Sequence, residues 1–210
     1  MGAAPSAAQA PVDRPFSMRG VELGTTIDEF KDAAIPNDED EYTNLQSGCS
    51  NDTGPKGDKF YLSSDDKAAG IVECKWYSSI KSLRIRMFWE HWIKIGKGSG
   101  IPTFRFIERD NELRLFEISF YANNQYYPDI HDALTRGYGP AEETVSPFQT
   151  KAGADFTSLR SVWNNGLSKI TLTQRCEHLE RYCLVYEHSE LSEKYRAIKE
   201  RQAQDAAKRI

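Results

Sequence analysis

The residues best suited to chemistry are two cysteines and two histidines near the carboxyl end of the chain. Cys176, His178, Cys183 and His188 follow one another with the spacing Cys-x-His-x4-Cys-x4-His. Thiolates and imidazoles are ligands that zinc prefers, so this set could be arranged as a tetrahedral site. The two cysteines also flank a predicted hairpin, where a cross-strand disulfide would join them. Because the disulfide needs fewer assumptions, we predict a disulfide there and no metal or other cofactor.

Motifs for other kinds of catalysis are missing from the sequence. It contains no His-Glu-x-x-His zinc motif, no phosphate-binding glycine loop and no Gly-x-Ser-x-Gly nucleophile elbow. His131, beside Asp132 on a predicted short helix, is interpreted as a surface residue. We therefore expect a protein without enzymatic activity. The alternative is a hydrolase or zinc-dependent enzyme whose site is assembled from dispersed residues such as His178 and His188.

The segment from Lys75 to Lys97 has the composition of a protein-binding surface. It holds three of the four tryptophans and six cations against a single acid, Glu90. Tryptophan, tyrosine and arginine are the residues that most often dominate binding energy at protein interfaces. Six cations also predict a partner with an acidic surface. The candidate binding residues are Trp76, Arg84, Arg86, Phe88, Trp89 and Trp92.

Two other interpretations of this segment stay open. Tryptophan is usually mostly buried, so the aromatic residues could fill the core while the cations lie in water. Basic and aromatic residues together can also contact an anionic membrane surface.

Composition limits the range of partners. The formal net charge is −4, whereas a general nucleic-acid-binding protein needs a basic face to neutralise phosphates. No apolar run approaches the roughly 20 residues that a membrane-spanning helix needs. Hydrophobic residues make up 39% and charged residues 28%, as in an ordinary globular protein. We expect a protein partner, no nucleic acid and no transmembrane segment.

Helix signals occur at three places. Thr26 and Glu29 have the spacing of a capping box, in which each side chain accepts a hydrogen bond from the other residue's backbone N–H. Pro128 suits the first turn of a second helix, which Gly137 is expected to cap. Ser189 is expected to begin a long terminal helix.

Strand signals fill most of the remaining chain. Residues 71–77 form one expected strand, and residues 102–121 form a hairpin that turns at Asp110–Asn111. Asn164–Gly166 is a second turn signal, with strands expected on both sides of it. Short helices combined with such strands predict an α+β fold with a helical layer on an antiparallel sheet.

The pattern of helix, strands and one cysteine pair occurs twice. We expect a flexible tail at residues 1–15, a first α+β unit at 16–100, and a second unit with the terminal helix at 101–210. One disulfide is predicted in each unit, Cys49–Cys74 and Cys176–Cys183. Disulfides persist in oxidising compartments, so we expect a periplasmic or extracellular protein whose signal peptide has been removed.

Three short motifs support a family resemblance. They are Leu-Gly-x-Thr-x-x-Glu-Phe at 23–30, Ala-Leu-x-x-x-Tyr-Gly-x-Ala at 133–141, and Trp-x-x-Gly at 163–166. Together they resemble bacterial envelope proteins of the β-lactamase-inhibitor-protein-like type and the small outer-membrane assembly lipoproteins. The resemblance implies tandem units of a short helix followed by antiparallel strands. It also implies binding of a partner protein, as inhibitors, immunity proteins and assembly factors do, and it implies no catalytic residues.

Overall fold

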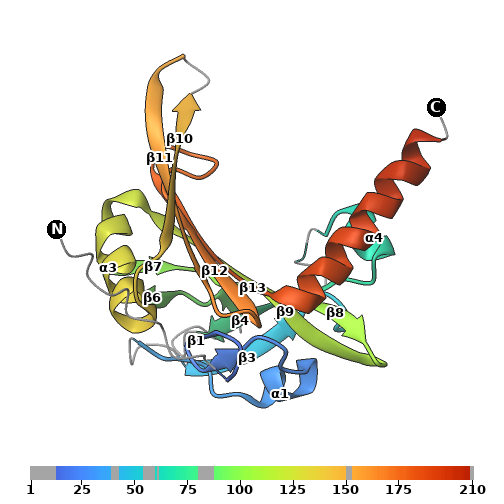
Figure 1. The fold of residues 1–210 in the computed structure, drawn as a ribbon. Coiled ribbons are helices and arrows are strands. Elements are labelled where there is room, and N and C mark those ends of the chain that lie inside the picture. Colours follow the sequence, from blue (N-terminus) through green and yellow to red (C-terminus); the bar gives the residue numbers. More distant parts are fainter. Residues whose placement is uncertain are drawn as a thin grey trace.

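The computed structural model describes residues 13–38, 43–53, 60, 62–79, 88–149 and 153–208 (Figure 1). Most of the tail expected at 1–15 lies outside the described residues. Helices and antiparallel strands make up the fold, which confirms the predicted α+β class. The strands are β1 (Ser17–Met18), β2 (Val21–Glu22), β3 (Thr43–Cys49), β4 (Val72–Ser79), β5 (Phe88–Glu90), β6 (Ile93–Ile95), β7 (Gly98–Gly100), β8 (Thr103–Arg109), β9 (Glu112–Asn123), β10 (Glu142–Gln149), β11 (Asp155–Asn164), β12 (Ser168–Thr173) and β13 (Arg181–His188). The helices are α1 (Ile27–Asp32), α2 (Ser64–Ala68), the 3-10 turn η2 (Asn124–Tyr126), α3 (Tyr127–Tyr138) and α4 (Ser189–Ala207).

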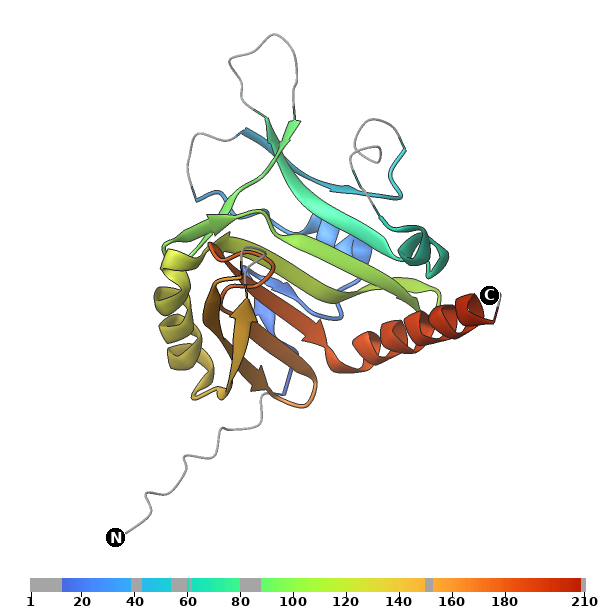
Figure 2. The ribbon, with the colours of Figure 1, turned by 90° about the horizontal axis from the view of Figure 1, so that it is seen from above.

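One antiparallel sheet organises the described part of the chain. Its strands run in the order β10-β11-β12-β13-β9-β8-β4-β3, and β5 pairs with β4 outside this path. Two four-stranded meanders therefore meet where β13 pairs with β9. Figure 2 shows α3 and α4 at opposite sides of this sheet. The unit boundary expected after residue 100 falls between β4 and β8, which are hydrogen-bonded neighbours.

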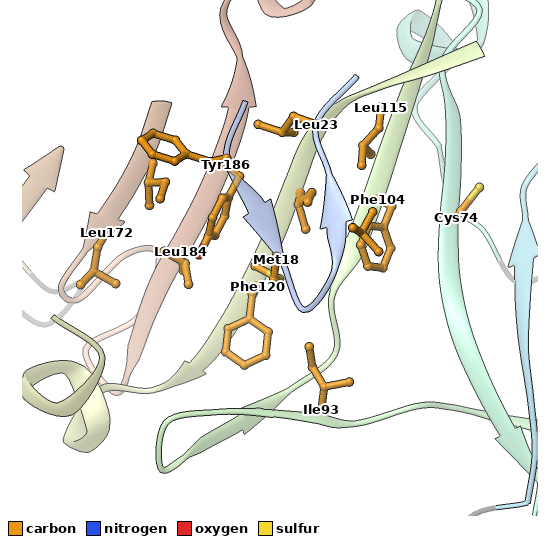
Figure 3. Packing of buried hydrophobic residues seen from close by; sticks show 14 of the residues in the cluster. Met18, Leu23, Cys74, Ile93, Phe104, Leu115, Phe120, Leu172, Leu184 and Tyr186 are labelled. Atoms are coloured by element: carbon orange, nitrogen blue, oxygen red, sulfur yellow. The ribbon is translucent and has the colours of Figure 1, made fainter. Parts of the chain in front are cut away.

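The first face of the sheet carries the main hydrophobic core. Phe104, Phe120 and Leu184, from three neighbouring strands, are fully buried there. The β1–β2 hairpin lies over this face, and Met18 and Leu23 join the same cluster (Figure 3). Helices α1 and α3 also pack against the cluster. The strands of both meanders therefore contribute to one continuous core on this face of the sheet.

The second face of the sheet is covered in part by α4. The apolar contact between them is a small separate cluster formed by Ile71, Ile107, Phe116 and Leu191, with Tyr195 and Ile198 packed against it. Beyond this contact the helix projects away from the sheet and from the β10–β11 ribbon (Figure 1). Polar contacts hold this projecting part, since the amide of Gln202 donates to the carbonyl of Asp65.

Local signals set several of the element boundaries. The capping box of Thr26 and Glu29 is confirmed at the start of α1. Asp110 and Asn111 turn between β8 and β9 with φ of 53° and 64°, as the predicted tight turn requires. The cap predicted at Gly137 is wrong, because α3 continues to Tyr138 and ends at Gly139, with φ of 84°. Only glycine adopts that positive φ without strain.

The terminal helix also begins differently from the prediction. Its N-cap is His188 and not Ser189: the imidazole Nδ1 accepts a hydrogen bond from the backbone N–H of Leu191, 3.5 Å away. Ser189 is instead the first residue of α4. The helix itself is confirmed and is 19 residues long.

Strand β10 was not predicted. Its described side chains from Glu142 to Pro147 are exposed, so the alternation of buried and exposed residues that marks a half-buried strand is missing. Pro147 also argues against a central strand, and β10 is indeed at the edge of the sheet.

Both predicted disulfides are formed. Cys49 and Cys74 join β3 to β4 inside the core, and Cys176 and Cys183 close a short loop that leads into β13. Among the described residues, no helix is long and apolar enough to cross a membrane.

Removal of the two disulfides should reduce stability by different amounts. The bridged residues are 25 apart for Cys49–Cys74 and 7 apart for Cys176–Cys183. Loop-closure entropy gives about 3.5 and about 2.5 kcal/mol respectively. Replacement of each pair by alanine, followed by urea unfolding, should show the larger loss for the first pair. Peptide mapping without reductant provides the control, and four free thiols in protein from an oxidising compartment would contradict the pairing.

The His188 cap should make stability depend on pH. Burial lowers the pKa of this imidazole; the Glu190 carboxylate opposes the shift and Arg109 adds to it. The folded state thus binds fewer protons than the unfolded state, so the cap contributes fully above about pH 6.5 and is lost as the pH falls through the lowered pKa. His188→Asn keeps an acceptor that does not titrate, and its free energy of unfolding should fall less than that of the parent chain between pH 7.5 and 5. His178→Asn, at an exposed site, should retain the parent's pH dependence.

Candidate binding surface

The three tryptophans of the candidate segment have different environments. Trp76 is fully buried, and its ring lies 4.6 Å from that of Phe104 and 6.2 Å from that of Phe30. It is therefore a core residue in this fold, and it is not accessible to a partner. The alternative interpretation, that aromatic residues of this segment fill the core, holds for Trp76.

Trp89 and Trp92 lie at the surface. Their exposed fractions are 39% and 53%, large values for indole side chains. Trp89 is on β5, opposite Ser78 of β4, and Trp92 follows between β5 and β6. Arg84, Arg86 and the side chain of Phe88 lie outside the described residues.

Two of the described lysines of the segment form side-chain ion pairs within the chain. Lys75 Nζ lies 2.7 Å from Glu90 Oε1, and Lys97 Nζ lies 2.9 Å from Asp129 Oδ1. These two cations are thus partly neutralised, which weakens the basis for an acidic partner. Among the described residues of the predicted site, the Trp89 and Trp92 indoles are the exposed ones.

Trp92 lines a surface hollow of about 470 Å³, which we call the aromatic hollow. Strand ends far apart in the sequence form its walls: β7, the end of β9, η2 and the start of β13. The lining side chains that carry an aromatic ring, a hydroxyl or a charge are Trp92, Ser99, Tyr121, Tyr126, Glu180 and Arg181. Tyr121 is 38% exposed, and burial raises the pKa of its phenol, with smaller contributions from Glu177 and Glu117. The hollow thus combines aromatic surface with neutral and charged hydrogen-bonding groups.

Close backbone packing holds the aromatic hollow in shape. A Cβ atom at Gly100 would lie 2.3 Å from the carbonyl oxygen of Tyr121, so only glycine lets β7 approach β9 this closely. On the other side, the Cys176–Cys183 disulfide closes the loop that carries Glu180 and Arg181. The walls are therefore built before any partner arrives, which reduces the entropy cost of binding.

Three of the four residues of the alternative zinc site have other roles. Cys176 and Cys183 are joined to each other, and His188 caps α4. His131 Nε2 lies 2.8 Å from Glu143 Oε1, and its ring packs between Tyr127 and Trp163. In the described part of the chain, no three His, Cys, Asp or Glu residues are grouped so that they could hold a metal ion.

Sequence reasoning missed Tyr121, Tyr126 and Arg181. One signal for Tyr121 was present, because it follows the apolar Phe120 in the predicted hairpin and successive strand residues point to opposite faces. Tyr126 follows the end of β9 and Arg181 begins β13, and only the pairing of β9 with β13 brings them together.

No protein-family model, curated protein or solved structure matches this chain. The three short motifs of the family resemblance thus stand alone, and function is inferred from the surface itself.

Gly100 offers a test of how the aromatic hollow is held. Gly100→Ala should force β7 off β9 and lower the free energy of unfolding by about 1–3 kcal/mol, as overpacking does. Trp92 fluorescence should shift as the hollow deforms. Gly137→Ala is the matched control, because its Cβ meets nothing within 4 Å and it lies in a helix, where alanine adds up to about 1 kcal/mol. Equal behaviour of the two variants would contradict this account of the hollow.

Proposed function

We propose that this chain is an exported, non-enzymatic protein that binds another protein through the aromatic hollow. The observation that carries the proposal is the exposed indole of Trp92 beside Tyr121 and Arg181 at a preformed hollow. Tryptophan, tyrosine and arginine are the residue types enriched in binding hot spots. The Trp89 indole is also exposed but is not among the residues that line the hollow.

Exposed aromatic surface favours a macromolecular partner. Burial of apolar area contributes roughly 25 cal/mol per Å². A partner that covers the Trp92 indole therefore makes the free energy of binding more favourable. Ser99, Glu180 and Arg181 provide polar groups around this indole, as at the rim of protein interfaces. A membrane surface would favour cations without carboxylate partners, whereas Lys75 and Lys97 have partners.

The order of the sheet supports a tandem arrangement. We infer that one unit is α1 with the β3-β4-β8-β9 meander and the other is α3 with the β10-β11-β12-β13 meander. The boundary would then lie between Asn123 and Asn124 rather than after residue 100, because this division keeps each meander whole. Tandem helix-and-strand units are what the family resemblance implies, and that family binds partner proteins.

The two disulfides support an oxidising location, the periplasm or the extracellular space. Inhibitors, immunity proteins and envelope-assembly factors share this location and this kind of function. The alternative zinc-dependent enzyme would need ligands other than Cys176 and Cys183, whose sulfur atoms are bonded to each other.

Site-specific photo-crosslinking tests the proposal. A photo-reactive residue at Ser99, an exposed position in the wall of the hollow, should give one discrete crosslinked product in the compartment where the protein resides. The same residue at Leu167, which is 43% exposed but outside the hollow, is the control. Identical products at both positions would indicate that the hollow has no special role.

Trp92→Ala should then weaken binding of the crosslinked partner by about 30-fold, the effect of a hot-spot residue worth about 2 kcal/mol. Leu167→Ala should change the affinity less than twofold in the same titration. Unchanged affinity of the Trp92 variant would contradict the proposed site, and retained thermal stability would show that the variant is folded.

A further inference from the structure

Charged side chains cross the second face of the sheet in one continuous row. Cross-strand neighbours in the register are Glu73 with Arg105, Arg105 with Glu117, Glu117 with Glu187, and Glu187 with Lys169. We call these five residues, from β4, β8, β9, β13 and β12, the charged row. Tyr195 of α4 packs on Arg105, with the guanidinium carbon 4.9 Å from the ring centroid, and the side chains of the row are partly exposed.

Carboxylates outnumber cations in and around the charged row. Arg105 is shared between Glu117 and Asp66, at 3.3 Å from each. The other ion pairs are Lys75 with Glu73 and Glu90, Lys199 with Asp65 and Asp66, and Lys169 with Glu187. Four cations thus face six carboxylates in these described ion pairs. Within these ion pairs negative charge is thus in excess.

Burial makes this excess energetically important. Desolvation raises the pKa of the Glu117 carboxyl, an effect that Arg105 opposes and Glu187 reinforces. It also raises the pKa of Glu73, although Lys75 and Arg105 oppose the shift. Partly buried carboxylates without full compensation gain from any additional cation placed above them.

The row is continuous with the aromatic hollow. A second hollow, of about 310 Å³, contains Glu73, Arg105 and Glu117 in its walls together with Tyr121, which also lines the aromatic hollow. Next to the charged row, a row of short side chains crosses the same face: Thr103, Ser119, Val185, Thr171 and Val162. Thr171 is 8% exposed, and its Oγ1 has no hydrogen-bond partner among the described residues. This face therefore combines a hollow with negative charge.

We propose that the second face of the sheet docks a segment of the partner protein that carries lysine or arginine side chains. This inference rests on the proposed protein-binding function and adds the chemistry of the partner. The basic side chains lie over Glu73, Glu117 and Glu187, while an adjacent apolar group of the partner contacts Tyr121 and Trp92. The acidic partner expected from the composition of the 75–97 segment is thereby replaced by a basic one on this face.

Two peptide probes test the charge without knowledge of the partner. The intact protein is titrated at low salt with a labelled nine-residue peptide of alternating lysine and threonine, and with its glutamate–threonine counterpart. The lysine peptide should bind, with amide chemical-shift changes at Thr103, Ser119 and Thr171, and the glutamate peptide should not. The double variant Glu73→Gln/Glu187→Gln should weaken binding about tenfold, roughly threefold for each partly buried charge. Glu142→Gln/Glu143→Gln, on the exposed edge strand β10, removes the same net charge elsewhere and should change it less than twofold.

Each other outcome overturns the inference. Absence of lysine-peptide binding, or equal weakening by both double variants, would show that the face does not select basic segments. Spermidine that binds equally well and displaces the peptide would indicate a site for small cations. These results do not depend on crosslinking at Ser99. If a crosslinked partner bound Glu73→Gln/Glu187→Gln as tightly as the parent chain, the protein-binding proposal would stand and only this inference would be overturned.

Discussion

The pairing of β9 with β13 is the interaction on which the rest of the structure depends. Seven residue pairs, from Glu117–Glu187 to Asn123–Arg181, join the last strands of the two meanders without a register shift. Because side chains alternate between faces, a slip of one residue here would place Phe120 and Leu184 on opposite faces, so that one of them would leave the core. It would also separate Tyr121 from Arg181 and break the charged row. The core, the aromatic hollow and the charged row thus all depend on the register of β9 with β13.

The two faces of the sheet differ in composition and in what covers them. On the first face, aromatic and aliphatic side chains from both meanders lie beneath α1, α3 and the β1–β2 hairpin, and their burial supplies most of the apolar stabilisation. On the second face, α4 covers one small apolar cluster, and charged and short polar side chains occupy much of the rest. Salt bridges on such a face add little net stability. The partly open face with its ion pairs is the surface that the proposed recognition role uses.

The elements that sequence reasoning predicted are those with strong local signals. The α1 capping box, the Asp110–Asn111 turn and the periodic strands around it depend only on nearby residues, and all are present. The errors occur where another interaction decides the boundary. The α3 helix passes Gly137 because Gly139 can adopt a positive φ, and α4 is capped by His188 because its imidazole reaches the Leu191 N–H.

The binding surface was predictable in part for the same reason. Composition marked Trp89 and Trp92, but it could not separate them from Trp76, because exposure depends on which strand faces the core. Tyr126 and Arg181 come together only through the pairing of β9 with β13, a long-range contact that no local pattern encodes. The charged row likewise exists only because five strands pair in this register. Its residues are scattered from Glu73 to Glu187 and form no motif along the chain.

Tyr121 connects binding to the stability of the whole molecule. It pairs with Cys183 across the β9–β13 junction and lines both hollows, so a partner that covers both hollows contacts the two meanders at once. Such a partner binds the folded chain and not the unfolded one, because the surface exists only when β9 and β13 are paired. Binding must then stabilise that pairing by mass action, in proportion to the logarithm of the partner concentration. The junction that builds the proposed recognition surface is thus also the element that binding of such a partner would strengthen.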